Sequence, residues 1–159
     1  MLPKETILEC DKLFNHYHPI ELDFNLDSKV RAEKMREWWD KEYGMIAKTE
    51  VYKDQLLSVV ERSEILLRFG VREMFEYCGQ TNTPVHVLSA GIGNFIEIIM
   101  QGLGIKCDIR SNFFTFDENS KIHGFNVPLI HSANKSKSVE DLEYEAVVVI
   151  GDMPSVSFI

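Results

Sequence analysis

The first 78 residues of the chain repeat apolar positions at the three-to-four-residue spacing typical of amphipathic helices. This spacing predicts a first helix over residues 5–17. Pro19 should end that helix, because proline disfavours the helical conformation in the residue that precedes it. The segment Pro19–Asp23 is therefore expected to form an extended linker.

A second helix is predicted to begin at Asp27 or Ser28, since either side chain can accept hydrogen bonds from the first free amides of a helix. This helix should run to about Glu42. Gly44 is expected to be its stop, because glycine is the residue that most often follows a helix.

Residues 52–77 show the helical spacing again, and two helices are expected there with Gly70 as the break between them. Convincing strand patterns occur only after residue 78. They lie at Val85–Leu88, near Cys107–Ile109, and at Asn112–Phe116, Ile122–Phe125 and Ala146–Ile150. This change of pattern predicts a helical region, residues 1–78, followed by an α/β region, residues 79–159.

The clearest strand pattern is Ala146–Ile150, which is apolar throughout, as expected of a central strand in a parallel sheet. Gly151 and Asp152 follow it, so a carboxylate would stand at the carboxyl end of a buried strand. Phe113–Phe116 and Ile122–Phe125 flank a turn-rich segment and are expected to pair as a hairpin.

The segment Pro84–Asn94 combines a strand pattern, a turn and the start of a helix pattern. Val85–Leu88 predicts a buried strand, Ser89 and two glycines predict a turn, and Phe95–Leu103 predicts a helix. Such a turn places backbone N–H groups at a helix N-terminus, where they can bind an anion. In open α/β sheets, ligands also bind outside the carboxyl ends of the strands. The turn is therefore a candidate phosphate site.

Composition narrows the class of protein. The hydrophobic content of 45% is ample for one domain core, and the net charge of −8 argues against binding to a nucleic-acid polymer or an anionic membrane. Three widely spaced cysteines without a Cys-x-x-Cys pair fit a reduced, cytoplasmic setting. We find no signal-peptide pattern and no run near the roughly 18 apolar residues of a membrane span.

Three features could converge on one phosphoryl group, namely the Ser89 turn, Lys135 and Asp152. A hydroxyl with backbone donors would hold the group, a lysine would neutralise its charge, and a carboxylate at a strand end could hold Mg²⁺. Each feature also has a plainer interpretation. Ser89 can be only a helix cap, Lys135 a solvated charge beside Lys137, and Asp152 a turn residue. Their order along an α/β chain favours the joint interpretation.

Several short motifs occur in one collinear order along nearly the whole chain. They are Pro19–Asp23, Glu37–Lys41, Ser89–Gly93, Ser111–Phe113 with Phe116–Asp117, Gly124–Phe125, Leu129–His131 with Asn134–Lys135, and Gly151–Asp152. With these motifs the sequence resembles the cytosolic 5'-nucleotidase III family, the pyrimidine 5'-nucleotidases of the haloacid dehalogenase-like superfamily. The Ser-Ala-Gly-Ile-Gly and Ile-His-x-x-Asn-Lys runs are specific only in combination.

The resemblance implies a Rossmann-like core with a helical cap inserted after its first strand. It also implies Mg²⁺-dependent hydrolysis of nucleoside 5'-monophosphates, pyrimidine ones in particular, through an aspartyl-phosphate. Ser89 and Ala90 would then lie at the phosphate, and Lys135 would be the catalytic residue that stabilises phosphoryl charge. Asp152 would help to hold Mg²⁺. Glu21, in the cap, would contact the nucleobase.

The chain departs from the family pattern at the first motif, Asp-x-Asp-x-Thr, whose two aspartates are the nucleophile and the general acid. No Asp-x-Asp occurs in the 159 residues, so the chain is expected to begin after that motif, with a core that lacks its first strand. Glu42 also stands where a substrate-contacting serine is expected, and an acid there would disfavour an anionic group.

These departures leave three functions open. The first is a 5'-nucleotidase whose complete form hydrolyses nucleoside monophosphates. Because covalent phosphoryl transfer needs an activated nucleophile, the second is a truncated, inactive relative that binds a nucleotide or a partner. The third is a related phosphatase that acts on another phosphoester.

Overall fold

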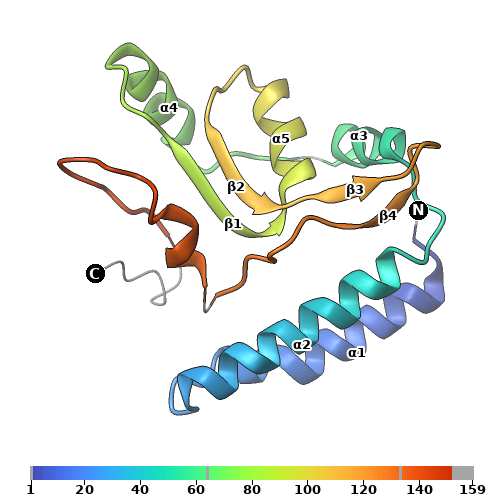
Figure 1. Cartoon of the computed structure of the whole chain (residues 1–159). Helices are drawn as coiled ribbons and strands as arrows, with labels where there is room; N and C mark the ends of the chain where they lie inside the picture. The colour runs from blue at the N-terminus through green and yellow to red at the C-terminus, as the bar shows by residue number, and fades with distance from the viewer. Residues whose placement is uncertain (1, 64, 133, 152–159) are drawn as a thin grey trace.

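The computed structural model describes residues 2–63, 65–132 and 134–151 (Figure 1). Its elements in chain order are the helices α1 (Lys4–Glu21), α2 (Ser28–Ile46), α3 (Lys53–Arg62) and α4 (Val71–Gln80), the strand β1 (His86–Ile92), the helix α5 (Gly93–Gly102), the strands β2 (Asp108–Asn112), β3 (Phe114–Phe116) and β4 (Ile122–Phe125), and the 3₁₀ helix η1 (Lys135–Val139). The predicted mixed α/β class is confirmed.

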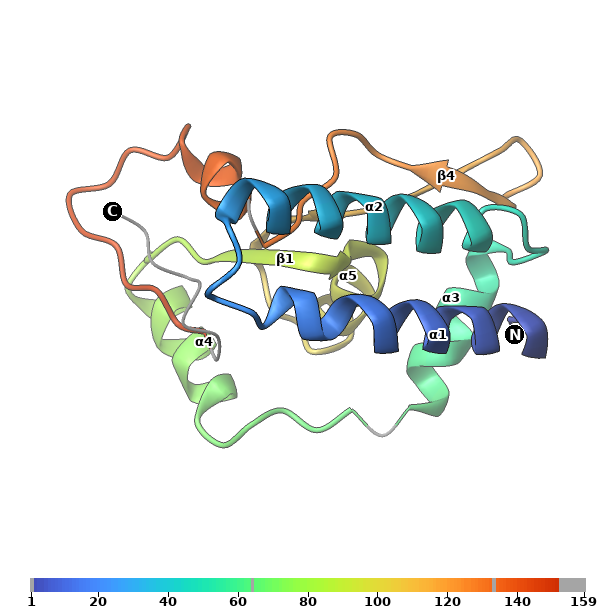
Figure 2. The same ribbon diagram turned by 90° about the horizontal axis from the view of Figure 1, so that it is seen from below.

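The helices α1 and α2 lie antiparallel and side by side along their whole length (Figures 1 and 2). Their contact surface is built from Tyr17, Met35 and Trp38, with Leu13 and Ile20 packed around them. Asp27 caps α2, as predicted, and its carboxylate accepts hydrogen bonds from the backbone N–H groups of Lys29 and Val30 at 3.0 and 3.2 Å.

The predicted end of the first helix is wrong, since α1 continues through Pro19 and the expected linker Pro19–Asp23 is mostly helical. Proline removes one backbone donor, but the hydrogen-bond ladder resumes beyond it, where the N–H of Leu22 donates to the carbonyl of His18 at 3.2 Å. Ile20 packs against α2. The packing of Ile20 against α2 therefore outweighs the local cost of the proline.

The predicted stop of the second helix near Gly44 is also wrong, because α2 runs on to Ile46. Glycine in a helix interior costs only about 1 kcal/mol relative to alanine. Tyr43, which precedes it, and Ile46, two residues after it, are 5% and 7% exposed and belong to the main core. Their burial requires that the helix continue.

The pattern over residues 52–77 forms the two expected helices, α3 and α4. Gly70 precedes α4 with a φ of 83°, in the left-handed region that favours glycine.

The strands form two small sheets. β1 and β2 are parallel, whereas β3 and β4 form the predicted antiparallel hairpin. The strand predicted over Asn112–Phe116 is divided, because Asn112 ends β2 and Phe114 begins β3. The chain therefore passes from the parallel sheet to the hairpin within one residue.

The strand predicted at Ala146–Ile150 is not formed in the structure. Its side chains are largely exposed, with Val147, Val148 and Ile150 at 69%, 86% and 76%. A strand needs a hydrogen-bonding neighbour to satisfy its backbone groups, and in the described ranges β1 pairs with β2 alone. Apolar character without such a neighbour does not produce a strand.

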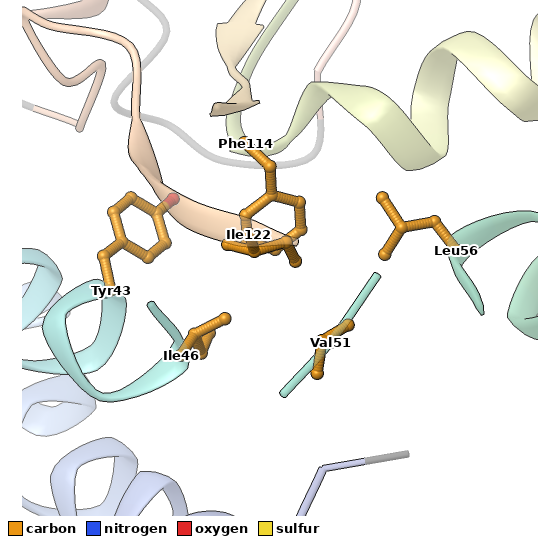
Figure 3. Close-up of a cluster of buried hydrophobic side chains, with 6 residues drawn as sticks. All are labelled: Tyr43, Ile46, Val51, Leu56, Phe114 and Ile122. Atoms are coloured by element: carbon orange, nitrogen blue, oxygen red, sulfur yellow. The ribbon is translucent and has the colours of Figure 1, made fainter. Parts of the chain in front are cut away.

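The main core joins the helices to the hairpin (Figure 3). Its buried side chains come from α2, the segment after it, α3 and the hairpin, and they are Tyr43, Ile46, Val51, Leu56, Phe114 and Ile122. This core crosses the predicted boundary between residues 78 and 79, and the division into two regions stays a prediction.

Gly93, the first residue of α5, lies directly against the ring of Phe113. A Cβ atom at Gly93 would stand 2.6 Å from the nearest carbon of that ring. Glycine is therefore required here by close approach. Gly102, at the other end of the same helix, has no atom within 4 Å of the equivalent position.

Replacing Gly93 by alanine should destabilise the protein by about 1–3 kcal/mol, because the ring of Phe113 must move to admit the methyl group. The free energy of unfolding in urea measures this effect. Gly102→Ala is the matched control and should leave stability unchanged or raise it by up to about 1 kcal/mol, because the site is open and alanine favours the helix. Equal stabilities for the two variants would show that the contact with Phe113 is not constraining.

Candidate functional site

Residues Ser89–Gly91 form an irregular stretch in β1, at the carboxyl half of the strand. Leu88 pairs with Arg110 and Ile92 pairs with Asn112, so three residues of β1 stand opposite one residue of β2. Such a bulge leaves backbone groups without their usual partners in the sheet. We refer to Ser89–Gly91 as the β1 bulge.

The β1 bulge replaces the helix-start turn that the sequence predicted at Ser89. α5 begins only after the strand ends, and its N-cap residue is Ile92. Ser89 is therefore not a helix cap. Its Oγ instead accepts a hydrogen bond from the N–H of Gly91 at 3.0 Å, and the carbonyl of Gly91 accepts one from the Oγ of Ser111 at 2.9 Å.

Asn112 is fully buried behind the β1 bulge. Its Nδ2 donates to the carbonyls of Ala90 and Ile130, both at 2.8 Å, and its Oδ1 accepts from the N–H of Ile130 at 2.7 Å. The hydroxyl of Tyr43 lies 3.2 Å from this Nδ2 and 3.4 Å from the carbonyl of Ala90. Burial raises the pKa of Tyr43 to about 12, so the phenol keeps its proton at neutral pH.

A second loop, residues 129–135, leads into η1, which contacts β1. Asn134 shapes this loop, because its side chain accepts from the N–H of His131 at 2.7 Å and donates to the carbonyl of Leu129 at 2.8 Å. His131 is 4% exposed, and burial lowers its pKa. The N–H of Lys135 donates to the carbonyl of His131 at 3.1 Å.

Lys135 differs from its neighbour Lys137 in burial. Lys135 is half-buried, whereas Lys137 is exposed. Within the described ranges the ammonium of Lys135 makes no hydrogen bond or ion pair. Of the two lysines, Lys137 is therefore the one whose exposure matches a solvated surface charge.

The other predicted site residues are not joined to this group. Glu21 is the half-buried last residue of α1, and no hydrogen bond or ion pair connects it with Ser89 or Lys135 in the part of the chain that the structure describes. Asp152 lies outside the described residues. The functional roles of Glu21, Ser89, Ala90, Lys135 and Asp152 stay predictions.

Glu42 lies half-buried on α2, close to the contact with α1. Burial raises the pKa of its carboxyl group, and the indole of Trp38 acts in the opposite direction. The Nε1 of Trp38 is buried and completes no hydrogen bond within the described ranges, so the nearby indole offsets the effect of burial on Glu42 only in part. The charge of Glu42 is thus poorly compensated.

A cavity of about 910 Å³ lies between α3, α5 and the turn of the hairpin. Its lining includes charged and polar side chains, among them Lys53, Asp54, Glu97 and Gln101. Among the described residues that line it, none is Glu21, Ser89, Ala90 or Lys135, so this cavity is separate from the predicted site.

Metal-binding clusters and membrane-spanning helices were both considered for the described residues, and these residues provide neither. They contain no group of three or more His, Cys, Asp or Glu side chains placed to hold a metal ion. In the same ranges, no helix combines the length and the apolar character that crossing a bilayer requires.

Sequence reasoning missed the side chains that support the β1 bulge, namely Tyr43, Ser111 and Asn112. A signal existed, because two polar residues stand at the carboxyl end of β2, where a fully buried parallel strand is usually apolar. Their significance depends on the register between β1 and β2, which the pattern of apolar residues does not supply.

Solved structures define the class to which the fold belongs. A hydrolase of the haloacid dehalogenase-like (HAD) family from Salmonella enterica aligns with 84% of this chain and 40% of the hydrolase chain, with a TM-score of 0.61. The two sequences are 17% identical, so this similarity concerns the fold alone. Cytosolic 5'-nucleotidase IIIB, solved with bound cytidine, matches 82% of this chain and 45% of its own, with a TM-score of 0.74 and 27% identity. The fold is that of the haloacid dehalogenase-like hydrolases.

The family follows from the sequence comparison. The model of the family described as "Pyrimidine 5'-nucleotidase (UMPH-1)" matches residues 1–153, and the chain therefore belongs to this family. The 7-methylguanosine phosphate-specific 5'-nucleotidase of Mus musculus is 35% identical over 134 residues, which cover 82% of this chain and 45% of the relative. The Homo sapiens protein of that name is 31% identical over 163 residues, which cover 96% of this chain and 54% of the relative. The chain spans about half the length of these relatives, and the resemblance identified from the motifs is confirmed.

Replacing Glu42 by glutamine should stabilise the protein near neutral pH. Because burial raises the folded-state pKa of Glu42 above its unfolded value, the ionised carboxylate destabilises the fold as the pH rises through the folded-state pKa. The variant should therefore melt at a higher temperature than the wild type at pH 7. The gain should shrink as the pH falls to about 4, where the wild-type carboxyl group is largely protonated.

Glu50→Gln is the control for this experiment, since Glu50 is exposed. Its melting temperature should follow the wild type at each pH. A gain for Glu42→Gln that persists unchanged at pH 4, or no gain at pH 7, would contradict the assignment of an uncompensated buried charge.

Proposed function

We propose that this chain is the substrate-binding part of a 5'-nucleotidase and holds nucleoside 5'-monophosphates by their phosphoryl group. The observation that carries the proposal is the β1 bulge, which the side chain of Asn112 connects to the segment that leads to Lys135. The proposed site therefore combines a hydroxyl, backbone amides and an ammonium group. These are the donors suited to anionic phosphoryl oxygens.

Each donor has a separate part in the proposed site. The Oγ of Ser89 accepts from Gly91, so its own proton is left to donate to a phosphoryl oxygen. The backbone at Ala90 would orient the group. The ammonium of Lys135, a half-buried residue, would offset the charge that develops on the phosphoryl oxygens.

The proposed hydrolysis also needs a nucleophile. A carboxylate oxygen would form a bond to phosphorus while the bond from phosphorus to the nucleoside 5'-oxygen breaks, and a general acid would protonate that oxygen. Water would then cleave the aspartyl-phosphate and release phosphate. The resemblance assigns these two roles to an Asp-x-Asp motif, and none occurs among the 159 residues. Binding without turnover is therefore the second candidate function for this chain.

Mg²⁺ belongs to the proposal through the resemblance. The described residues do not form a site for it, because they include no cluster of metal-ligating side chains. Asp152, the residue that the resemblance assigns to the metal, lies outside them. We therefore derive no step of the reaction through the metal ion.

The nucleobase is the least constrained part of the substrate. The family description names pyrimidines, a solved relative holds cytidine, and several relatives are named for 7-methylguanosine phosphate. We propose a pyrimidine nucleoside monophosphate, with Glu21 at the base. Glu42, in place of the expected serine, would bias the choice against anionic groups. A cytoplasmic location fits the relative whose name includes "cytosolic".

Replacing Lys135 by alanine should weaken the binding of CMP about tenfold or more, because a charge-assisted contact with the phosphoryl group is lost. Calorimetric titration with CMP, UMP and 7-methyl-GMP measures the affinity. Lys137→Ala is the matched control and should bind like the wild type. Equal affinities for the two variants would remove Lys135 from the site.

Phosphate release in the presence of Mg²⁺, followed on the same samples, separates the two candidate functions. Turnover that is lost in Asp152→Ala would rule out binding without catalysis. Binding of CMP without release of phosphate would support the second candidate. The absence of both would contradict both candidates for this chain.

A further inference from the structure

The β1 bulge needs hydrogen-bond partners from outside the strand ladder. Three consecutive residues stand opposite one residue of β2, so their carbonyls lose the regular pairing of a parallel sheet. A half-buried carbonyl without a partner is costly. A carbonyl turned toward an anion would also repel it. The orientation of these peptide groups therefore decides whether the bulge can hold a phosphoryl group.

Two side chains at the end of β2 take the place of the missing ladder bonds. The Oγ of Ser111 donates to the carbonyl of Gly91 at 2.9 Å, and the Nδ2 of Asn112 donates to the carbonyl of Ala90 at 2.8 Å. Ser111 is 3% exposed and Asn112 is fully buried. Both carbonyls are thus held toward the protein interior.

The donor count of Asn112 explains the role of Tyr43. The Nδ2 group has two hydrogens, and its two short contacts, to the carbonyls of Ala90 and Ile130, use both of them. The hydroxyl of Tyr43, 3.2 Å from this Nδ2, is then free to donate to the carbonyl of Ala90, 3.4 Å away. Helix α2 therefore contributes a second hydrogen-bond donor to the carbonyl of Ala90 in the bulge.

Asn112 also reaches the loop that carries Lys135. Its side chain accepts from and donates to the backbone of Ile130, the residue before His131. The carbonyl of His131 in turn accepts the N–H of Lys135 at 3.1 Å. The side-chain amide of Asn112 thus connects the β1 bulge with the loop formed by residues 129–135, which we call the lysine loop.

We propose that Tyr43 and Asn112 are positioning residues that fix the peptide orientation of the β1 bulge and its spacing from the lysine loop, and so determine the affinity for the phosphoryl group. This assignment rests on the proposed function. It goes beyond it because neither side chain touches the ligand. Both act through the carbonyl of Ala90, and Asn112 acts also through Ile130.

The test compares Tyr43→Phe and Asn112→Asp with the wild type. Tyr43→Phe removes one hydroxyl and keeps the ring. Asn112→Asp keeps the shape but replaces the donating nitrogen with an oxygen that repels the carbonyls of Ala90 and Ile130. Tyr77→Phe is the control, because Tyr77 is 65% exposed on α4.

The measured quantities are the dissociation constants for inorganic phosphate and CMP, determined well below the melting temperature of each variant. We expect affinity to fall about threefold in Tyr43→Phe and about tenfold in Asn112→Asp, with no change in Tyr77→Phe. A purely structural role would lower the melting temperature but leave the affinity of the folded protein unchanged. If Asn112→Asp does not fold, Tyr43→Phe decides the question.

The outcomes separate this assignment from the function on which it rests. Binding by the wild type with equal affinity in both folded variants would overturn the positioning role alone. Failure of the wild type to bind either probe would overturn the proposed function, and the positioning role with it.

Discussion

The buried amide of Asn112 is the interaction on which the candidate site depends. It joins the carbonyl of Ala90 in β1, the hydroxyl of Tyr43 in α2 and the backbone of Ile130 before the lysine loop. In a low-dielectric interior, a fully satisfied polar group of this kind favours one arrangement strongly, because every alternative leaves a donor or acceptor unpaired. The site is therefore assembled from segments that lie far apart in the sequence.

The apolar surface of the chain is covered unevenly. The side chains of the core between α2, α3 and the hairpin are buried and lie together (Figure 3). By contrast, β1 is only half-buried along its length, and the apolar segment Val147–Ile150 is exposed. Strands in parallel sheets are normally covered on both faces. The stability of this half of the fold therefore rests more on β2, α5 and the polar contacts of Asn112 than on a sealed hydrophobic layer.

The sequence predicted what local periodicity can determine. The helices, the cap at Asp27 and the hairpin follow from spacing and side-chain chemistry. The helix ends near Pro19 and Gly44 were wrong because packing between α1 and α2 and in the main core outweighs local propensity. The β1 bulge was not predictable, since it arises from a register shift between strands distant in the chain. For the same reason, the Ser-Asn pair at the end of β2 had no evident role until the pairing was known.

The β1 bulge and the loop that carries Lys135 are proposed to hold one phosphoryl group together. Amide chemical shifts of the ¹⁵N-labelled full chain, recorded during a titration with CMP, test this proposal most directly. We expect the largest shifts at Ser89–Gly93 and around Lys135. Shifts confined to the cavity between α3 and α5, or no saturable shifts at all, would contradict it.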